Sequence, residues 1–131
     1  LELAKWLQKQ SEVAWVNYPG LTSSKYYDLA QHYLPEGQSG VVTFGLKSGF
    51  EGAKKVADGT KLFALVANIG DTKSLIIHPA STTHQQLSEA QQISTGVSKD
   101  LIRLSVGLED VEDLKADLKA VFEKISVSNK V

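Results

Sequence analysis

The sequence predicts an α+β fold, a two-layer sandwich in which helices cover one face of a mainly antiparallel sheet. The first observation is the order of hydrophobic patterns, because helical and strand-like stretches alternate and three apolar, strand-like runs precede a last helix. The second is composition: 42% hydrophobic and 22% charged residues are typical of a soluble globular protein. The third is length, since 131 residues without a repeat, low-complexity tract or linker correspond to one domain.

The first half of the chain predicts three helices and two strands. A helix is expected at 1–11, where three apolar residues share one face: Leu3, Ala4 and Leu7. The strand VAWVNY at 13–18 stops at Pro19–Gly20. A helix at 24–34 ends at the PEG of 35–37, and the strand VVTFGLK follows at 41–47. Residues 50–60 predict a short helix.

Two apolar runs lie on either side of a turn-like GDTK in the middle of the chain. The run at 62–70 fits either a strand or a continuation of the preceding helix, because the pattern of a short apolar run does not separate the two. The run at 74–79 predicts a strand. Residues 81–98 are polar and aperiodic, which predicts a loop with a short helix near 87–92.

The last part of the chain predicts a strand at 101–107 and a long amphipathic helix. Six apolar residues recur on one helical face: Val111, Leu114, Leu118, Val121, Phe122 and Ile125. Asp110 is the expected N-cap, and Glu112 and Asp113 suit the positive end of the helix dipole. The tail SVSNKV at 126–131 is expected to be frayed.

Charge, hydropathy and cysteine content exclude several classes of function. The net charge is −1 and no run of basic residues occurs, so we expect no nucleic-acid partner. No apolar stretch approaches the roughly 18 residues of a membrane span, so we expect no membrane partner. The absence of cysteine removes disulfides, thiolate catalysis and cysteine metal sites, and fits a cytoplasmic protein.

The chain contains no methionine, although translation starts with one, and it opens on the helix-like LELAKWLQKQ. We therefore expect residues 1–131 to be a fragment or an excised domain of a longer protein.

Arg103 is the only arginine, and it lies in the otherwise apolar strand LIRLSVG. Strand alternation directs Ile102 and Leu104 to one face and Arg103 to the other. A guanidinium group presents a planar fork of donors that suits a carboxylate or a phosphate. One interpretation is capture of a small carboxylate, with Gly107 allowing close approach of a ligand or backbone. The alternative is an internal salt bridge or a side chain extending to water.

The histidines and serines give weaker evidence for a metal site or a catalytic site than Arg103 gives for a binding site. His78 and His84 do not have a zinc-site spacing and His32 has no nearby partner, so no metal site is expected. Ser81 or Ser105 could pair with a histidine, but neither lies in the strand–turn–helix context of a nucleophilic serine.

The segments NIGDTKSLIIHPASTTHQQL at 68–87 and GVSKDLIRLSVGLEDVEDLKADLKAVF at 96–122 resemble the carboxy-terminal domain of the Cys/Met-metabolism enzymes that use pyridoxal phosphate. YPGL at 18–21 and GVVTFGLK at 40–47 match earlier segments of that family, so the resemblance covers nearly the whole chain. Asn68, the STTH at 81–84 and STGVSKDLIR at 94–103 are most similar to the O-acetylhomoserine sulfhydrylases.

The resemblance implies a substrate-binding role. Arg103 would grip the α-carboxylate of the amino-acid substrate, Asn68 would help to hold the same group through its side chain or backbone, and Thr83 would lie close by. The Schiff-base lysine and the phosphate-binding residues would belong to a larger preceding domain, and Lys73 is not that lysine. Residues 1–131 would then hold no catalytic or cofactor-binding residue, bind no cofactor alone and be inactive alone.

The whole enzyme, implied by the same resemblance, would be a homotetramer that converts O-acetyl-L-homoserine and sulfide to L-homocysteine and acetate. Two alternatives stay open at this point. One is a sister activity of the family: cystathionine γ-synthase, cystathionine γ-lyase or methionine γ-lyase. The other is a free-standing module that binds amino acids and regulates a partner.

Overall fold

The computed structural model describes the backbone of residues 1–128 and the side chains of residues 1–126. Within residues 1–128, five strands form one sheet in the order β1-β2-β5-β4-β3. The strands are β1 (Val13–Asn17), β2 (Val41–Leu46), β3 (Ala64–Leu65), β4 (Leu75–Ile77) and β5 (Leu101–Ser105). The pairs β1–β2, β2–β5 and β4–β5 are antiparallel and only β3–β4 is parallel, which confirms the mainly antiparallel sheet.

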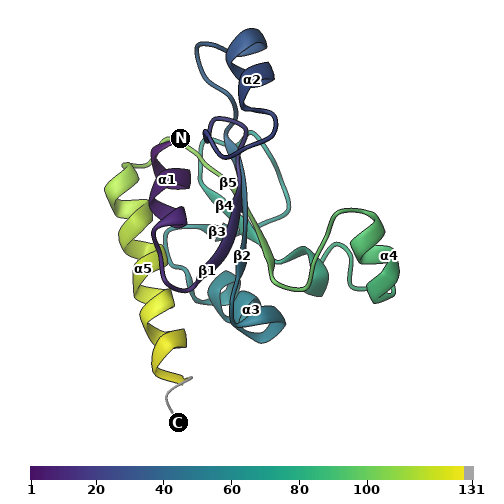
Figure 1. Cartoon of the computed structure of the whole chain (residues 1–131). Coiled ribbons are helices and arrows are strands. Elements are labelled where there is room, and N and C mark those ends of the chain that lie inside the picture. The colour runs from purple at the N-terminus through teal and green to yellow at the C-terminus, as the bar shows by residue number, and fades with distance from the viewer. Residues whose placement is uncertain (129–131) are drawn as a thin grey trace.

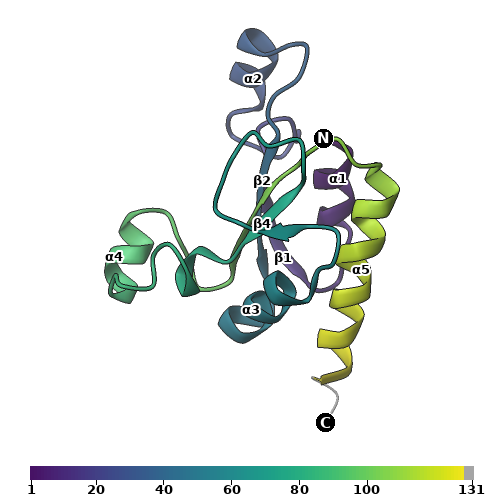
Figure 2. The same ribbon diagram turned by 180° about the vertical axis from the view of Figure 1, so that it is seen from behind.

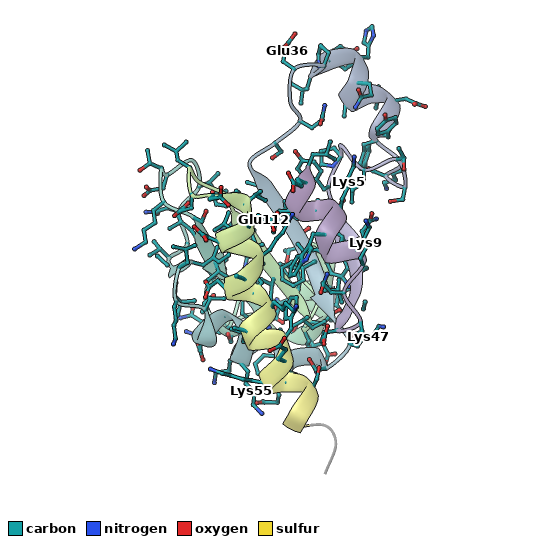
Figure 3. All side chains as sticks on the ribbon, turned by 90° about the vertical axis from the view of Figure 1, so that its left-hand side faces the viewer. Lys5, Lys9, Glu36, Lys47, Lys55 and Glu112 are labelled. Atoms are coloured by element: carbon teal, nitrogen blue, oxygen red, sulfur yellow. The ribbon has the colours of Figure 1, made fainter. Side chains whose placement is uncertain are left out.

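Three helices cover one face of this sheet: α1 (Glu2–Gln8), α3 (Gly49–Gly59) and α5 (Val111–Ser128). Their apolar faces meet the sheet in a core that includes Phe44, Ile102, Leu104, Leu118 and Phe122, all at most 1% exposed. Figure 3 shows α1 beside α5, and the exposed seam between them is bridged by Lys115, whose ammonium contacts Glu2 and Glu112. The predicted two-layer arrangement is therefore correct.

The remaining helices, α2 (Tyr27–Tyr33) and α4 (Glu89–Ser94), project away from the sheet, as Figures 1 and 2 show from opposite sides. The 3₁₀ turn η1 (Pro79–Ser81) follows β4. Large apolar side chains on and around α2 are exposed: Tyr26, Leu29, Tyr33 and Leu34. The helical pattern of this segment therefore does not correspond to a face buried by the described residues.

Several predicted boundaries were wrong, and local hydrogen bonds explain why. The first helix ends at Gln8 rather than residue 11, because the Gln10 side chain bonds the Trp6 carbonyl and the chain turns. The second begins at Tyr27, since Ser24 forms a turn that occupies the amide of Tyr26. The short helix predicted near 87–92 spans Glu89–Ser94, where Ser88 and Gln91 form a capping box.

The ambiguous run at 62–70 is neither a helix nor a long strand. Only Ala64–Leu65 pairs, in parallel with β4, and the chain beyond residue 65 is irregular. Asp110 does cap α5, because its Oδ1 accepts a 2.8 Å hydrogen bond from the amide of Glu112. The frayed end predicted from residue 126 is wrong for 126–128, which continue α5, and residues 129–131 lie outside the described part.

Candidate functional site

Arg103 lies at the centre of the sheet, on the face opposite the three packed helices. In β5 its register partners are Thr43 of β2 and Ile77 of β4. Ile102 and Leu104, on either side of it, are fully buried in the helix-covered core, whereas Arg103 is half-buried. The prediction from strand alternation is confirmed for these three residues.

The guanidinium group of Arg103 contacts the backbone rather than a carboxylate. Its Nη2 donates a 2.8 Å hydrogen bond to the carbonyl oxygen of Ala67. Within residues 1–126 this is the only hydrogen bond of the guanidinium, and no acidic side chain forms an ion pair with it. An internal salt bridge therefore does not explain this arginine among the described residues, and most of its five donors remain free for a ligand.

The contact with Ala67 is the first of a series between two segments. We call residues 67–74 (ANIGDTKS) the strap; it runs without regular structure over the sheet face that carries Arg103. Alternate residues of RLSVGLE hold it: Arg103 bonds Ala67, Ser105 Oγ accepts from the amide of Gly70 at 3.3 Å, and the Gly107 amide donates to Ser74 Oγ at 2.8 Å.

Gly107 and Glu109 secure the carboxyl end of the strap. A Cβ atom on Gly107 would overlap the carbonyl oxygen of Thr72, so the close approach predicted for this glycine is made by backbone. Glu109 accepts hydrogen bonds from both the amide and the hydroxyl of Ser74. Burial acts to raise the pKa of Glu109, but the bonds from Ser74 outweigh it and leave the pKa below its ordinary value of 4.5.

Asn68, the second predicted site residue, lies on the strap directly after the residue that Arg103 bonds. Its side chain is exposed and makes no hydrogen bond within the described part of the chain. The amides of Ala67, Asn68 and Ile69 are likewise unpaired among the described residues. This end of the strap therefore offers unpaired N–H donors beside a cation that has no acidic partner among the described residues.

Thr83, the third predicted residue, is exposed, and its Oγ1 lies 2.8 Å from Nδ1 of His84. It lines a hollow of about 510 Å³ together with Ala67 and Ile77. Ala67 is the hydrogen-bond partner of Arg103 and Ile77 is its register partner, so the hollow borders two neighbours of the arginine. The structure shows no direct contact among Arg103, Asn68 and Thr83.

The histidines and serines form structural contacts. His78 is 1% exposed; its Nε2 donates to the Lys99 carbonyl at 2.7 Å and its Nδ1 lies 2.8 Å from Ser81 Oγ. The pair fastens the end of β4 to the chain before β5, and burial of the imidazole separates it from any substrate. Within the described residues no group of three His, Asp or Glu side chains could hold a metal ion.

Some neighbours of the site were not identified from the sequence. Thr43 lies opposite Arg103 on the same sheet face, a position that the alternation of VVTFGLK could have indicated. Trp15 donates from Nε1 to Asp100 at 2.9 Å, and its indole crosses Gly45, where a Cβ atom would overlap it. No sequence signal joins residues 85 positions apart.

The described residues include no helix long and apolar enough to cross a membrane.

This α+β domain presents a guanidinium group that has no acidic partner among the described residues, and unpaired backbone amides lie beside it. A family model described as Cys/Met metabolism PLP-dependent enzyme matches residues 1–123. The chain belongs to this family of pyridoxal phosphate-dependent enzymes.

Two curated relatives are similar to the chain over most of its length. The chain is 56% identical over 119 residues to O-acetyl-L-homoserine sulfhydrylase 1 of Thermus thermophilus. The matched region covers 91% of the chain and 28% of the relative. The chain is also 52% identical over 126 residues to O-acetyl-L-homoserine sulfhydrylase of Leptospira meyeri, covering 95% and 28%. The chain thus spans a little over a quarter of the length of these relatives.

A solved structure has the same fold. A Campylobacter jejuni protein assigned as O-acetylhomoserine (thiol)-lyase superposes with a TM-score of 0.86 at 47% identity, over 93% of this chain and 29% of that one. That structure contains N'-pyridoxyl-lysine-5'-monophosphate, a lysine joined to the cofactor.

The residues described here do not fit that cofactor by themselves. A lysine that forms a Schiff base is typically desolvated, which lowers its pKa. Every lysine within residues 1–126 is exposed except Lys115, whose ammonium is held by Glu2 and Glu112. These two contacts raise the pKa of Lys115, the opposite of what a nucleophilic amine needs. No step of cofactor chemistry is therefore assigned to a lysine of this segment.

Proposed function

We propose that residues 1–131 are the carboxy-terminal, substrate-carboxylate-binding domain of a pyridoxal phosphate-dependent O-acetylhomoserine sulfhydrylase. The observation that carries this proposal is Arg103, a half-buried guanidinium group without an acidic partner among the described residues. Its hydrogen-bond partner Ala67 and its register partner Ile77 line a hollow of about 510 Å³. The names of the relatives supply the substrate class, since the chain shares 56% and 52% identity with sulfhydrylases that use O-acetyl-L-homoserine.

The reaction proposed for the whole protein is a replacement at Cγ. The Cγ–O bond of O-acetyl-L-homoserine breaks, acetate leaves with the bonding electrons, and sulfide forms a Cγ–S bond to give L-homocysteine. Pyridoxal phosphate supplies the electron sink for this chemistry when it is bound. A larger preceding domain would carry the Schiff-base lysine and the phosphate site, and the complete enzyme would be a homotetramer in the cytoplasm.

The role of this domain is to fix one end of the substrate. Two parallel bonds from Arg103 to the α-carboxylate would set the orientation of the Cα–H bond, which is catalysis by positioning. Asn68 would add a donor from its amide or backbone, because both are free on the strap. Thr83 would border the carbon chain of the substrate from across the hollow.

Kinetics of the full-length enzyme test this proposal. Changing Arg103 to Ala should lower kcat/KM for O-acetyl-L-homoserine by about a hundred-fold, the usual effect of removing one partner of a charge-assisted pair. Arg103→Lys should recover only part of the loss, since lysine lacks the planar fork. The control is Lys55→Ala, which removes the same charge from an exposed position on α3, away from the strap, and should leave kcat/KM unchanged. Equal behaviour of the Arg103→Ala and Lys55→Ala enzymes would refute a carboxylate role for Arg103.

A further inference from the structure

We infer that Ser105 is a positioning residue for the carboxylate site, acting through the strap rather than on the substrate. This inference rests on the proposed function of Arg103 and assigns the support of that site to a residue two positions along the same strand. The hydroxyl of Ser105 holds the amide of Gly70, and the geometry of the strap between Ala67 and Thr72 depends on that bond.

The surroundings of Ser105 provide no other reason for a hydroxyl group. Its register partners are Val41 and Leu75, both apolar, and its side chain is only 4% exposed. A hydroxyl buried among apolar neighbours is unfavourable unless it is hydrogen-bonded. Within the described residues its one partner is the Gly70 amide at 3.3 Å.

The strap has few other attachments at this point. Arg103 holds it at the Ala67 carbonyl, and the next attachment beyond Gly70 is the Thr72 carbonyl, which accepts from the Leu108 amide at 2.9 Å. Residues 68 and 69 lie between the contacts made by Arg103 and Ser105, are exposed, and make no hydrogen bond within the described chain.

The backbone conformation of Gly70 adds to the importance of its hydrogen bond with Ser105. The φ of +80° at Gly70 lies in the left-handed region, and the chain bends at this residue, which Ser105 holds. Loss of the Ser105 hydroxyl would let this turn move, and with it the free amides of Asn68 and Ile69. The guanidinium of Arg103 would stay on its strand. The expected consequence is weaker binding of a carboxylate without loss of the fold.

The test compares two inhibitors of the full-length enzyme, L-norvaline and L-norvalinamide, which have no leaving group at Cγ and differ in having a carboxylate or a carboxamide. Ser105→Ala should raise the inhibition constant of L-norvaline against O-acetyl-L-homoserine by about two- to ten-fold, the range of one ordinary hydrogen bond. It should leave the inhibition constant of L-norvalinamide unchanged. The control is Ser126→Ala, which removes a hydroxyl bonded to Glu12 far from the strap and should change neither constant.

The outcomes separate this inference from the proposal beneath it. An equal change for both ligands, or no change for either, would show that Ser105 does not position the carboxylate site. If Ser105→Ala does not fold, Ser105→Cys keeps a weaker acceptor of similar size, and the same comparison of ligands decides the question. Arg103→Ala is measured in parallel: if it still binds L-norvaline as well as the unaltered enzyme does, the carboxylate role itself is wrong.

Discussion

At the scale of single residues, the sequence RLSVGLE has two functions that alternate along the chain. Leu104 is directed into the helix-covered core, while Arg103, Ser105 and Gly107 are directed to the strap. The same alternation that builds a strand therefore also builds a row of contacts for one irregular segment.

Gly107 is required where the strap comes closest to the chain after β5. Gly107→Ala should destabilise the protein by about 1–3 kcal/mol, because a methyl group there overlaps the backbone of Thr72 and the backbone cannot move aside as a side chain would. Urea unfolding of the variant measures this. Gly37→Ala is the matched control, since no atom lies within 4 Å of a Cβ at that position. Equal stabilities of the two variants would contradict the close approach.

Glu109 makes the strap sensitive to acid. Its pKa in the folded chain is lowered below 4.5, so its contribution to stability is present above that pH and is lost as the pH falls through the folded value. Glu109→Gln should therefore reduce stability at pH 7 and make the fall in stability below about pH 4.5 less steep. Thermal melting across pH 3 to 7 measures both effects. Glu36→Gln, at an exposed position, should keep the acid response of the unaltered chain.

At the scale of elements, α5 does more than cover the sheet. Asp117 on this helix accepts hydrogen bonds from the backbone amides of Lys61, Leu62 and Phe63, at 2.8, 2.8 and 3.2 Å. These residues connect α3 to β3, so one carboxylate fixes the path of the chain toward the edge of the sheet.

Asp117→Ala should destabilise the chain by about 2–4 kcal/mol, because three backbone amides lose a charged acceptor at once. Chemical unfolding gives the value, and hydrogen exchange at residues 61–63 should accelerate. Glu123→Ala on the exposed side of the same helix is the control and should change stability by less than about 0.5 kcal/mol. Protection of these amides in the Asp117→Ala chain would show that the helix does not anchor this connection.

Elements with a regular hydrophobic period could be predicted from the sequence, and those held by distant side chains could not. The period identified α5, β2 and β5, and the acidic residue before α5 identified its cap. The short β3 has no period of its own, since its position depends on Asp117 and on pairing with β4. The start of α4 was predicted two residues early, although Ser88 and Gln91 have the capping-box spacing that could have placed it.

Some residues of the candidate site could be predicted from the strand pattern, and others could not. Strand alternation alone placed Arg103 on the face opposite the core, and Gly107 indicated a close approach. Asn68 and Thr83 were predicted only from the family resemblance, because an irregular strap and an exposed turn carry no periodic signal. The hydrogen bond between Ser105 and Gly70 was not predicted at all, since it joins residues 35 positions apart.

At the scale of the whole molecule, the face around Arg103 is polar at its centre and apolar at its edge. Exposed apolar side chains lie on the strap and next to it: Ile69 on the strap itself, and Leu65, Val66 and Leu108 beside it, of which Leu108 is 82% exposed. Such a cluster of exposed apolar side chains indicates a surface that another part of a protein covers. In the proposed function that part is the large domain of the same enzyme.

The 131-residue chain, prepared alone, should therefore self-associate through this face and bind free amino acids only weakly. Sedimentation over a range of concentrations should show oligomers, and Leu108→Asp should shift them toward monomer. Leu29→Asp, on the projecting α2, should have a smaller effect. A monomer at all concentrations that binds L-norvaline tightly would instead favour a free-standing amino-acid-binding module.

The central claim is that Arg103 holds the α-carboxylate of the substrate, and an absorbance titration of the full-length protein tests it most directly. With pyridoxal phosphate bound, the cofactor band of the unaltered enzyme should shift when O-acetyl-L-homoserine is added. In Arg103→Ala the band should be present but should shift only at about hundred-fold higher substrate, the same loss as expected for kcat/KM. A substrate response that is unchanged in Arg103→Ala, or a full-length protein that binds no cofactor, would contradict the account.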